Sequence, residues 1–177
     1  MKLHIGYGQD PKKWYINLDG IKLPGVDIVH DLEIFPYPFK DNTFDEIYSA
    51  HVLEHMSDLG KVMEELTRIG KNGTEIKVIV PYFTNPWTWA DYTHKRAFTT
   101  GSFNYFHPDF FYNHGAKILV KKYRIHFLWN KKVFLKSYGI INTIFDSIIN
   151  IAPKFYERFF AYIFPSAEIH YLLEIKK

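Results

Sequence analysis

The chain has 177 residues, of which nearly half are apolar, and it carries a formal net charge of +3 and no cysteine. This length predicts one domain, residues 1–177, with a substantial apolar core. Without cysteine, the protein has no disulfide, no thiolate metal site and no cysteine nucleophile. The sequence shows neither a signal peptide nor a run of about 20 apolar residues that would span a membrane. We therefore expect a cytoplasmic protein.

The charge is unevenly distributed along the chain. Residues 117–177 contain 11 lysines and arginines against four acids, whereas residues 1–116 contain 11 basic residues against 15 acids. A basic, aromatic segment is a feature of proteins that bind nucleic acid or membrane surfaces. Here the aromatic residues do not alternate with a dense basic run, so we expect no nucleic-acid partner.

Short apolar segments bounded by turn residues recur along the chain and predict strands. Only a handful of residues separate Gly8 from Trp14, although a parallel crossover normally needs about 10–12 residues or more. We therefore expect the first crossover helix to be missing or reduced to a turn. The predicted strands are Lys2–Ile5, Tyr15–Leu18, Val26–His30, Phe44–Ser49, Glu75–Val80, Lys117–His126 and His170–Ile175.

One segment between these strands has a clear helical pattern. In Leu59–Ile69, apolar residues recur every three or four positions and charged residues fill the opposite side, as in an amphipathic helix. Asp58 is placed to cap its N-terminus, and Gly70 with Gly73 ends it. Strands that alternate with such a helix favour a mostly parallel α/β sheet.

A long segment without clear periodicity, Tyr82–His114, follows the fifth predicted strand. Connections of this length in a compact domain are usually functional, and α/β folds bind ligands at the carboxyl ends of their strands. We therefore expect residues 82–114 to form a lid over a ligand site.

Residues 130–166 read as a helical insertion before the last strand. Two amphipathic helices, 139–150 and 154–164, are separated by Pro153. Their apolar sides are rich in Ile and Phe. Four roles are open for these sides: packing against the sheet, a homodimer interface, a cap over the site, or contact with a membrane surface.

The first third of the chain has four features in a specific order. Gly6-Tyr7-Gly8 follows the first strand, and an acid, Asp19, follows the second. Asp31-Leu32 follows the third strand, and the fourth leads into His51-Val52-Leu53-Glu54-His55. This order and spacing resemble the class I S-adenosylmethionine-dependent methyltransferases, in particular the type 11-like branch. The resemblance implies a Rossmann-like methyltransferase sheet with an antiparallel last strand.

A second motif strengthens this resemblance. The run Asp91-Tyr92-Thr93-His94-Lys95-Arg96-Ala97-Phe98 is similar to an Asp-Pro-Thr-His-Lys-Arg-x-Phe signature of the same branch. Tyr92 stands where the signature has proline. The motif lies in the predicted lid, on the side where the family binds the methyl acceptor.

The resemblance implies S-adenosylmethionine as the cofactor and indicates where it binds. Glycines allow the backbone to approach a ligand closely, and an acid at the end of the second strand is placed to accept ribose hydroxyls. The next acid and its apolar neighbour lie where the family contacts adenine. The alternative for both acids is an ordinary solvated turn. The predicted cofactor-binding residues are Gly6, Gly8, Asp19, Asp31, Leu32 and His51.

Methylation of a hydroxyl requires removal of its proton. His94, oriented by Asp91, is the first candidate for this base, and His51 is the second. The alternative role for His94 is a hydrogen bond that pins the lid. Asp91, His94 and Glu54 are candidate ligands of a hard cation, but no close pair of carboxylates marks such a site. We therefore predict no metal, with an acceptor-side Mg²⁺ as the open alternative.

The branch is often linked to the modification of polysaccharides and natural products. The resemblance therefore implies an O-methyltransferase that acts on a glycan or small-molecule hydroxyl. The alternative is a catalytically inactive protein that keeps the fold and binds the cofactor as a scaffold. The reduced glycine motif and the missing crossover helix favour that alternative.

Overall fold

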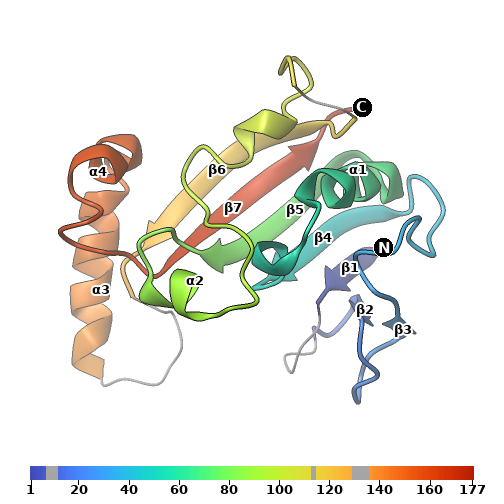
Figure 1. The fold of residues 1–177 in the computed structure, drawn as a ribbon, viewed down its shortest axis with the longest axis horizontal. Helices are drawn as coiled ribbons and strands as arrows, with labels where there is room; N and C mark the ends of the chain where they lie inside the picture. Colours follow the sequence, from blue (N-terminus) through green and yellow to red (C-terminus); the bar gives the residue numbers. More distant parts are fainter. Residues whose placement is uncertain (7–11, 113–114, 129–135) are drawn as a thin grey trace.

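A sheet of seven strands forms the centre of the computed structural model, which describes residues 1–6, 12–112, 115–128 and 136–177. Its strands are β1 (Lys2–Ile5), β2 (Ile16–Asp19), β3 (Ile28–Val29), β4 (Phe44–Ala50), β5 (Gly70–Pro81), β6 (Ile118–His126) and β7 (Glu168–Ile175). Their order is β3-β2-β1-β4-β5-β7-β6 (Figure 1). Strands β1 to β5 pair in parallel, and β7 is antiparallel to both β5 and β6. The predicted sheet with an antiparallel last strand is confirmed.

The connections among the first four strands contain little regular structure. Residues 20–27 and 30–43 form turns and bends without a helix, and so do residues 12–15 before β2. The remaining part of the first crossover, residues 7–11, lies outside the described residues. In the part that the structure describes, the first crossover therefore has no helix, as the short spacing predicts.

The helix α1 (Leu59–Ile69) has the bounds that its apolar pattern predicts. The Asp58 side chain caps it by accepting a hydrogen bond from the N–H of Lys61 (3.0 Å), and Gly70 follows its last turn. α1 crosses in front of the sheet in Figure 1, with its apolar side buried. The buried apolar residues of α1 are Leu59, Val62, Met63, Leu66 and Ile69.

Only one face of the sheet is well covered. α1 and the segment 82–112 lie over one face of the sheet (Figure 1), and on β5 the side chains of Ile76 and Val78 are fully buried. Lys77 and Ile79 point to the other face, where they are partly exposed and line a shallow cavity of about 350 Å³. Parallel sheets usually have both faces covered by crossover helices. The second face is exposed here because the first crossovers supply no helix in their described parts.

The helix α3 (Lys136–Ile149) stands at the end of the sheet beside β6 (Figure 1). It turns polar side chains toward the sheet. The Asp146 carboxylate accepts a hydrogen bond from the N–H of Phe127 (2.7 Å). The Asn150 side chain accepts from the N–H of Ile125 (2.9 Å) and donates to its carbonyl oxygen (2.7 Å). These bonds hold α3 by the side that its sequence pattern would leave in solvent.

Most of the apolar side of α3 is exposed, and so are most apolar side chains of the helix α4 (Pro153–Phe159) and of the segment after it. Ile149 is buried and Phe145 stacks on Phe127, but most of the described Ile and Phe side chains are not covered by the sheet, which leaves a dimer interface, a cap over the site or a membrane surface for them. No described helix is long and apolar enough to cross a membrane. We call this surface the α3–α4 apolar surface; it consists of Ile140, Ile141, Ile144, Ile148, Ile151, Phe155, Phe159, Phe160, Tyr162, Ile163 and Phe164.

A carboxylate organises the less covered face near β1. Glu46 on β4 accepts a hydrogen bond from the Tyr15 hydroxyl and from Nζ of Lys77 (2.9 Å), and it forms an ion pair with Nζ of Lys2 (3.0 Å). These contacts join β1, β4, β5 and the residue before β2. The Glu46 carboxylate thus links four neighbouring segments on a face that no described helix protects.

The acid stability of the protein should depend on Glu46. Burial raises the pKa of its carboxyl, but the hydrogen bonds from Tyr15, Lys77 and Lys2 outweigh burial and lower the pKa from 4.5 to about 2. The ionised form therefore stabilises the fold above pH 4.5, and this contribution is lost as the pH falls toward 2. We expect Glu46→Gln to lower the free energy of unfolding by about 1–2 kcal/mol at pH 7 and to match the wild type near pH 2 in denaturant titrations.

The control is Glu75→Gln, which removes the exposed carboxylate that pairs opposite Glu46 on β5. Because like charges oppose each other there, its removal should not lower stability at either pH. Equal stability of the wild type and Glu46→Gln at pH 7 would contradict the assignment.

Candidate functional site

The carboxyl ends of β1, β2 and β4 meet at one edge of the sheet, because these strands run parallel. Gly6 follows β1, Asp19 ends β2 and His51 follows β4. Asp31 lies beside the end of β2, since its Cα is 3.9 Å from the position of a Cβ at Gly20. The structure thus brings four of the predicted cofactor-binding residues to the carboxyl edge.

Gly6 is required by the backbone and by its neighbour. Its φ angle is +64°, in the left-handed region that favours glycine. A Cβ at Gly6 would come within 2.1 Å of Cγ2 of Val52, in the segment after β4. Glycine therefore allows β1 and this segment to approach each other closely. Gly8, the second predicted glycine, lies outside the described residues.

The two predicted acids also hold turns. Oδ1 of Asp19 accepts a hydrogen bond from the N–H of Ile21 (2.9 Å), and Oδ1 of Asp31 accepts one from the N–H of Glu33 (2.9 Å). Both carboxylates lie at the surface of the carboxyl edge, Asp31 more exposed than Asp19. Leu32 differs, because it is only 6% exposed and belongs to the core. Its carbonyl oxygen accepts a hydrogen bond from the Tyr37 hydroxyl (2.9 Å).

His51 lies between two buried acids. Its Nδ1 is 3.5 Å from Oε1 of Glu54, and its Nε2 is 3.5 Å from Oε1 of Glu168. Burial lowers the pKa of His51, but its interactions with Glu168 and Glu54 outweigh burial and raise the pKa to about 9. His51 is therefore a cation at neutral pH. Its φ of +55° is a strained conformation for a residue other than glycine, of the kind that concentrates at functional sites.

Glu168 is a site residue that the sequence pattern misses. The pattern starts the last strand at His170, whereas β7 begins at Glu168. Burial raises the pKa of Glu168, but hydrogen bonds with His170 and His51 outweigh it and lower the pKa to about 2. A buried acid at the start of an antiparallel strand gives no local signal in the sequence, because its partner His51 is distant along the chain.

His94 is held in the lid near the helix α2 (Pro86–Ala90). Its side chain is 8% exposed, its Nδ1 donates to the carbonyl oxygen of Thr88 (3.2 Å), and its Nε2 lies 3.7 Å from Oδ2 of Asp91. The Asp91 carboxylate accepts hydrogen bonds from the Thr93 side chain and backbone, which lower its pKa and keep it ionised. The structure thus places Asp91 beside His94, as predicted.

The basic residues of the same motif pin the lid to the segment after β4. The N–H of Lys95 donates to the carbonyl oxygen of Glu54 (2.8 Å). The Arg96 guanidinium donates to the carbonyl oxygens of Met56 (2.6 Å) and Ser57 (2.9 Å). Lys95 and Arg96 therefore hold the lid against residues 54–57, while the hydrogen bond of His94 to Thr88 lies within the lid itself.

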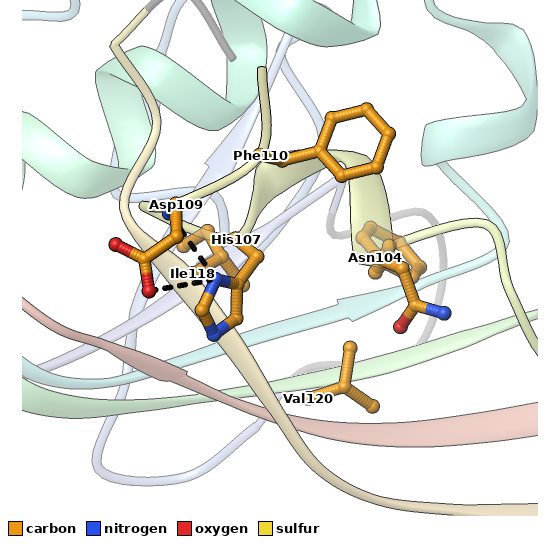
Figure 2. Close-up of a pocket in the computed structure, with 7 residues that line it drawn as sticks. Asn104, His107, Asp109, Phe110, Ile118 and Val120 are labelled. Carbon is orange, nitrogen blue, oxygen red and sulfur yellow. Dashed lines mark hydrogen bonds and ion pairs between the residues drawn. The ribbon is translucent and has the colours of Figure 1, made fainter. Parts of the chain in front are cut away.

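A cavity of about 290 Å³ lies apart from these residues, between β6 and the 3₁₀ helix η2 (Asn104–Phe106). Figure 2 shows His107 and Asp109 at its side, where the N–H of Asp109 donates to Nδ1 of His107 (3.2 Å). Ile118 in its wall pairs with Ile175 at the end of β7 and so lies at the amino edge of the parallel strands. Ligands of α/β folds bind at the opposite edge, so this cavity is not part of the predicted site.

The close approach at Gly6 can be tested against a second glycine. Gly6→Ala should destabilise the protein by about 2–4 kcal/mol, because strain at positive φ adds to a clash with Val52. Gly73 has φ of +83° and nothing within 4 Å of a Cβ, so Gly73→Ala should cost only about 1 kcal/mol. Thermal and denaturant unfolding measure both effects.

A double variant separates strain from the clash. Gly6→Ala should be partly rescued by Val52→Ala, giving a coupling energy in the double-mutant cycle. Equal losses for Gly6→Ala and Gly73→Ala, without coupling to Val52, would reject the steric explanation.

Comparisons with known proteins agree with this geometry. Residues 7–76 match the family described as "Methyltransferase domain". No curated protein sequence is significantly similar to the chain. Three solved structures share its fold with a TM-score of 0.59. A SAM-dependent methyltransferase from Archaeoglobus fulgidus is 14% identical, with 99% of this chain and 85% of that chain covered. The YcgJ protein from Bacillus subtilis is 16% identical, with 99% and 91% covered.

The third structure is a putative methyltransferase in complex with the activator Trm112 from Haloferax volcanii. It is 15% identical, and the alignment covers 98% of this chain and 81% of that chain. Together with the strand order and the family match, these structures confirm the predicted resemblance. Residues 7–76 thus match a methyltransferase domain, and the chain as a whole has the fold of class I S-adenosylmethionine-dependent methyltransferases.

Proposed function

We propose that the protein transfers a methyl group from S-adenosylmethionine to a hydroxyl group of a glycan or another small molecule. The observation that carries this proposal is the convergence of Gly6, Asp19 and His51 at the carboxyl edge. The motif Asp91–Phe98 lies against the same segment after β4 through Lys95 and Arg96. Cofactor-binding and lid residues are therefore neighbours.

The residues at the carboxyl edge fit the cofactor. Asp19 ends β2, and the backbone of Asp31 lies close to the neighbouring Gly20, with its Cα 3.9 Å from the position of a Cβ there. Asp19 would accept the ribose hydroxyls, while Asp31 and the Leu32 backbone would contact adenine. The bound cofactor supplies a methyl carbon made electrophilic by a positively charged sulfur. The protein then has to align the acceptor hydroxyl and remove its proton.

The three predicted catalytic residues differ in whether they can accept the proton of the acceptor hydroxyl. His51 is protonated at neutral pH, since its pKa is raised to about 9 by Glu168 and Glu54, and a protonated imidazole accepts no proton. His94 donates through Nδ1 to a carbonyl oxygen, so its Nε2 carries the lone pair. We therefore retain His94, with Asp91 beside it, as the side chain that acts on the acceptor proton.

A second candidate function is a scaffold that binds the cofactor without turnover. The helix-free connections 20–27 and 30–43 and the exposed sheet face favour it, because they leave the cofactor side less enclosed than in a fully covered α/β fold. The two functions differ in a measurable way, since both predict cofactor binding and only the first predicts methyl transfer.

Asp19 should be needed for cofactor binding. Asp19→Ala should weaken binding of S-adenosylhomocysteine by about 1–3 kcal/mol, because hydrogen bonds to a charged acceptor are lost. Isothermal titration calorimetry on the full chain measures this effect. Asp109→Ala, at an exposed acid on the opposite edge, should leave the affinity unchanged. If the folded wild-type protein does not bind S-adenosylhomocysteine, the proposed function is rejected. If it binds the cofactor but transfers no methyl group to any hydroxyl acceptor, the scaffold function is favoured.

For the α3–α4 apolar surface we propose contact with an anionic membrane surface, with a homodimer as the competing outcome. Aromatic and aliphatic side chains are exposed there next to the basic residues Lys154 and Arg158. This combination suits the boundary between headgroups and acyl chains.

Wild-type protein should therefore co-sediment with vesicles that contain phosphatidylserine, and salt should weaken binding because it screens the basic residues. The double variant Ile144→Ser/Phe155→Ser should lose binding, whereas Ile21→Ser, at an exposed isoleucine elsewhere, should not. If the wild type instead forms a stable dimer and binds no vesicles, and the double variant is monomeric, then the α3–α4 apolar surface is a homodimer interface and not a membrane-binding surface.

A further inference from the structure

Three side chains capable of binding a metal converge where the lid meets the segment after β4. One ligand atom each from Glu54, His55 and His94 lie within 4.8 Å of one another. Glu54 and His55 belong to the 3₁₀ helix η1 (Leu53–His55), and His94 comes from the lid. The rings of His55 and His94 meet edge to face, with their centroids 4.7 Å apart. The main-chain bond from Lys95 to Glu54 keeps the two segments in contact.

The hydrogen bonds of both histidines assign their tautomers. Nδ1 of His94 faces the carbonyl oxygen of Thr88, which only accepts, so this nitrogen carries the proton. The Thr93 hydroxyl donates to the ionised Asp91 (2.6 Å) and therefore accepts from Nδ1 of His55 (2.9 Å). Each ring thus has its lone pair on Nε2. Hydrogen bonds of this kind from the second nitrogen are typical of metal-binding histidines.

Glu54 presents a second, independent observation. Its carboxylate is 1% exposed, and neither oxygen accepts a hydrogen bond from any described residue. Nδ1 of His51 is 3.5 Å from Oε1, beyond a good hydrogen bond. A buried carboxylate without hydrogen bonds is costly. The His51 cation balances part of the charge without a hydrogen bond, so both oxygens of Glu54 remain free to coordinate a metal ion.

We propose that Glu54, His55 and His94 bind one divalent metal ion of the Zn²⁺ type. Two imidazole nitrogens and one carboxylate suit zinc and related transition metals, whereas magnesium prefers oxygen ligands. Metal–ligand bonds of about 2.0–2.2 Å would draw the ligand atoms to about 3.3 Å from one another, so small side-chain rotations complete the site. Three protein ligands leave a fourth position open. Asp91, 3.7 Å from Nε2 of His94, adds negative charge beside the ion.

Metal binding at this site does not depend on the methyltransferase proposal, but its role in the reaction rests on it. At the open position the ion would bind the acceptor hydroxyl and lower its pKa, so that the proton would pass to solvent water as the oxygen takes the methyl group. His94 then acts on the acceptor proton through the metal rather than by accepting it. This inference replaces the prediction of no metal. The sequence suggests Asp91, His94 and Glu54 as candidate ligands, whereas the proposed site has His55 in the place of Asp91.

The test uses the untagged full chain, stripped of metal with a chelator. Titration with Zn²⁺ in a calorimeter should give one site, and bound Zn²⁺ should raise the melting temperature. Co²⁺ should bind at the same site and develop visible absorption of a four-coordinate ion. The titrations contain neither cofactor nor acceptor, so these readouts stand even if the protein transfers no methyl group.

Variants then assign the ligands. Glu54→Gln, His55→Ala and His94→Ala should each weaken Zn²⁺ binding by more than about tenfold and abolish the Co²⁺ spectrum, and Thr93→Val should weaken it by about 10–100-fold through His55. His107→Ala is the matched control, because Nδ1 of His107 also lies 3.7 Å from an acid, Asp109, and it should bind Zn²⁺ like the wild type.

Circular dichroism establishes whether each variant is folded. The conservative Glu54→Gln keeps the shape of the side chain and removes only its charge, so it serves as the decisive variant if an alanine variant fails to fold. Wild type that does not bind Zn²⁺, or binding that Glu54→Gln and Thr93→Val leave unchanged, would overturn the proposal. The proposal would also be overturned if His107→Ala lost as much Zn²⁺ affinity as His94→Ala.

Discussion

The close packing of residues 51–57 against their neighbours is the constraint on which the carboxyl edge depends. Val52 fills the space that a side chain at Gly6 would need, and so brings β1 and the end of β4 together. His51 reaches the start of β7 at Glu168. The carbonyl oxygen of Glu54 accepts the main-chain bond from Lys95 in the lid. One short segment therefore positions the glycine turn, the lid and the last strand relative to one another, and a shift in it would move all three.

This arrangement also explains how a small protein keeps a ligand edge with few helices. The carboxyl edge is held by local contacts between loops, and the buried side of the sheet by α1 and the lid, so the second face contributes little to either. On that face, alternation of apolar and charged residues replaces a helical layer: Lys77 lies beside Ile79 on β5, and Glu46 gathers its three donors. Ion pairs and an aromatic hydroxyl give the exposed face a defined structure without a covering layer.

Much of the fold follows from local pattern. The strands, α1 and its cap at Asp58 are encoded by periodicity and turn residues, which act over a few positions. The orientation of α3 is not encoded in this way, because amphipathicity shows which side is apolar and not which side meets the protein. There, Asp146 and Asn150 accept hydrogen bonds from the N–H groups of Phe127 and Ile125 near the end of β6, while most of the apolar side of α3 stays exposed. The site divides in the same way: motifs indicate Gly6, Asp19, His51 and His94, whereas Glu168 and the buried state of Glu54 depend on contacts between distant segments.

The attachment of α3 has a consequence for the energetics of local opening. α1 is held by an apolar side that is buried along its whole length, whereas α3 is attached near the end of β6 by polar side chains and by the apolar contacts of Phe145 and Ile149. Hydrogen bonds to the protein are readily exchanged for hydrogen bonds to water, so their net contribution is small. α3 should therefore separate from the sheet at a lower free energy than global unfolding, as a unit of its own. In hydrogen exchange, the amides of α1 would then exchange only through global unfolding, whereas the amides of α3 would exchange faster, through local opening.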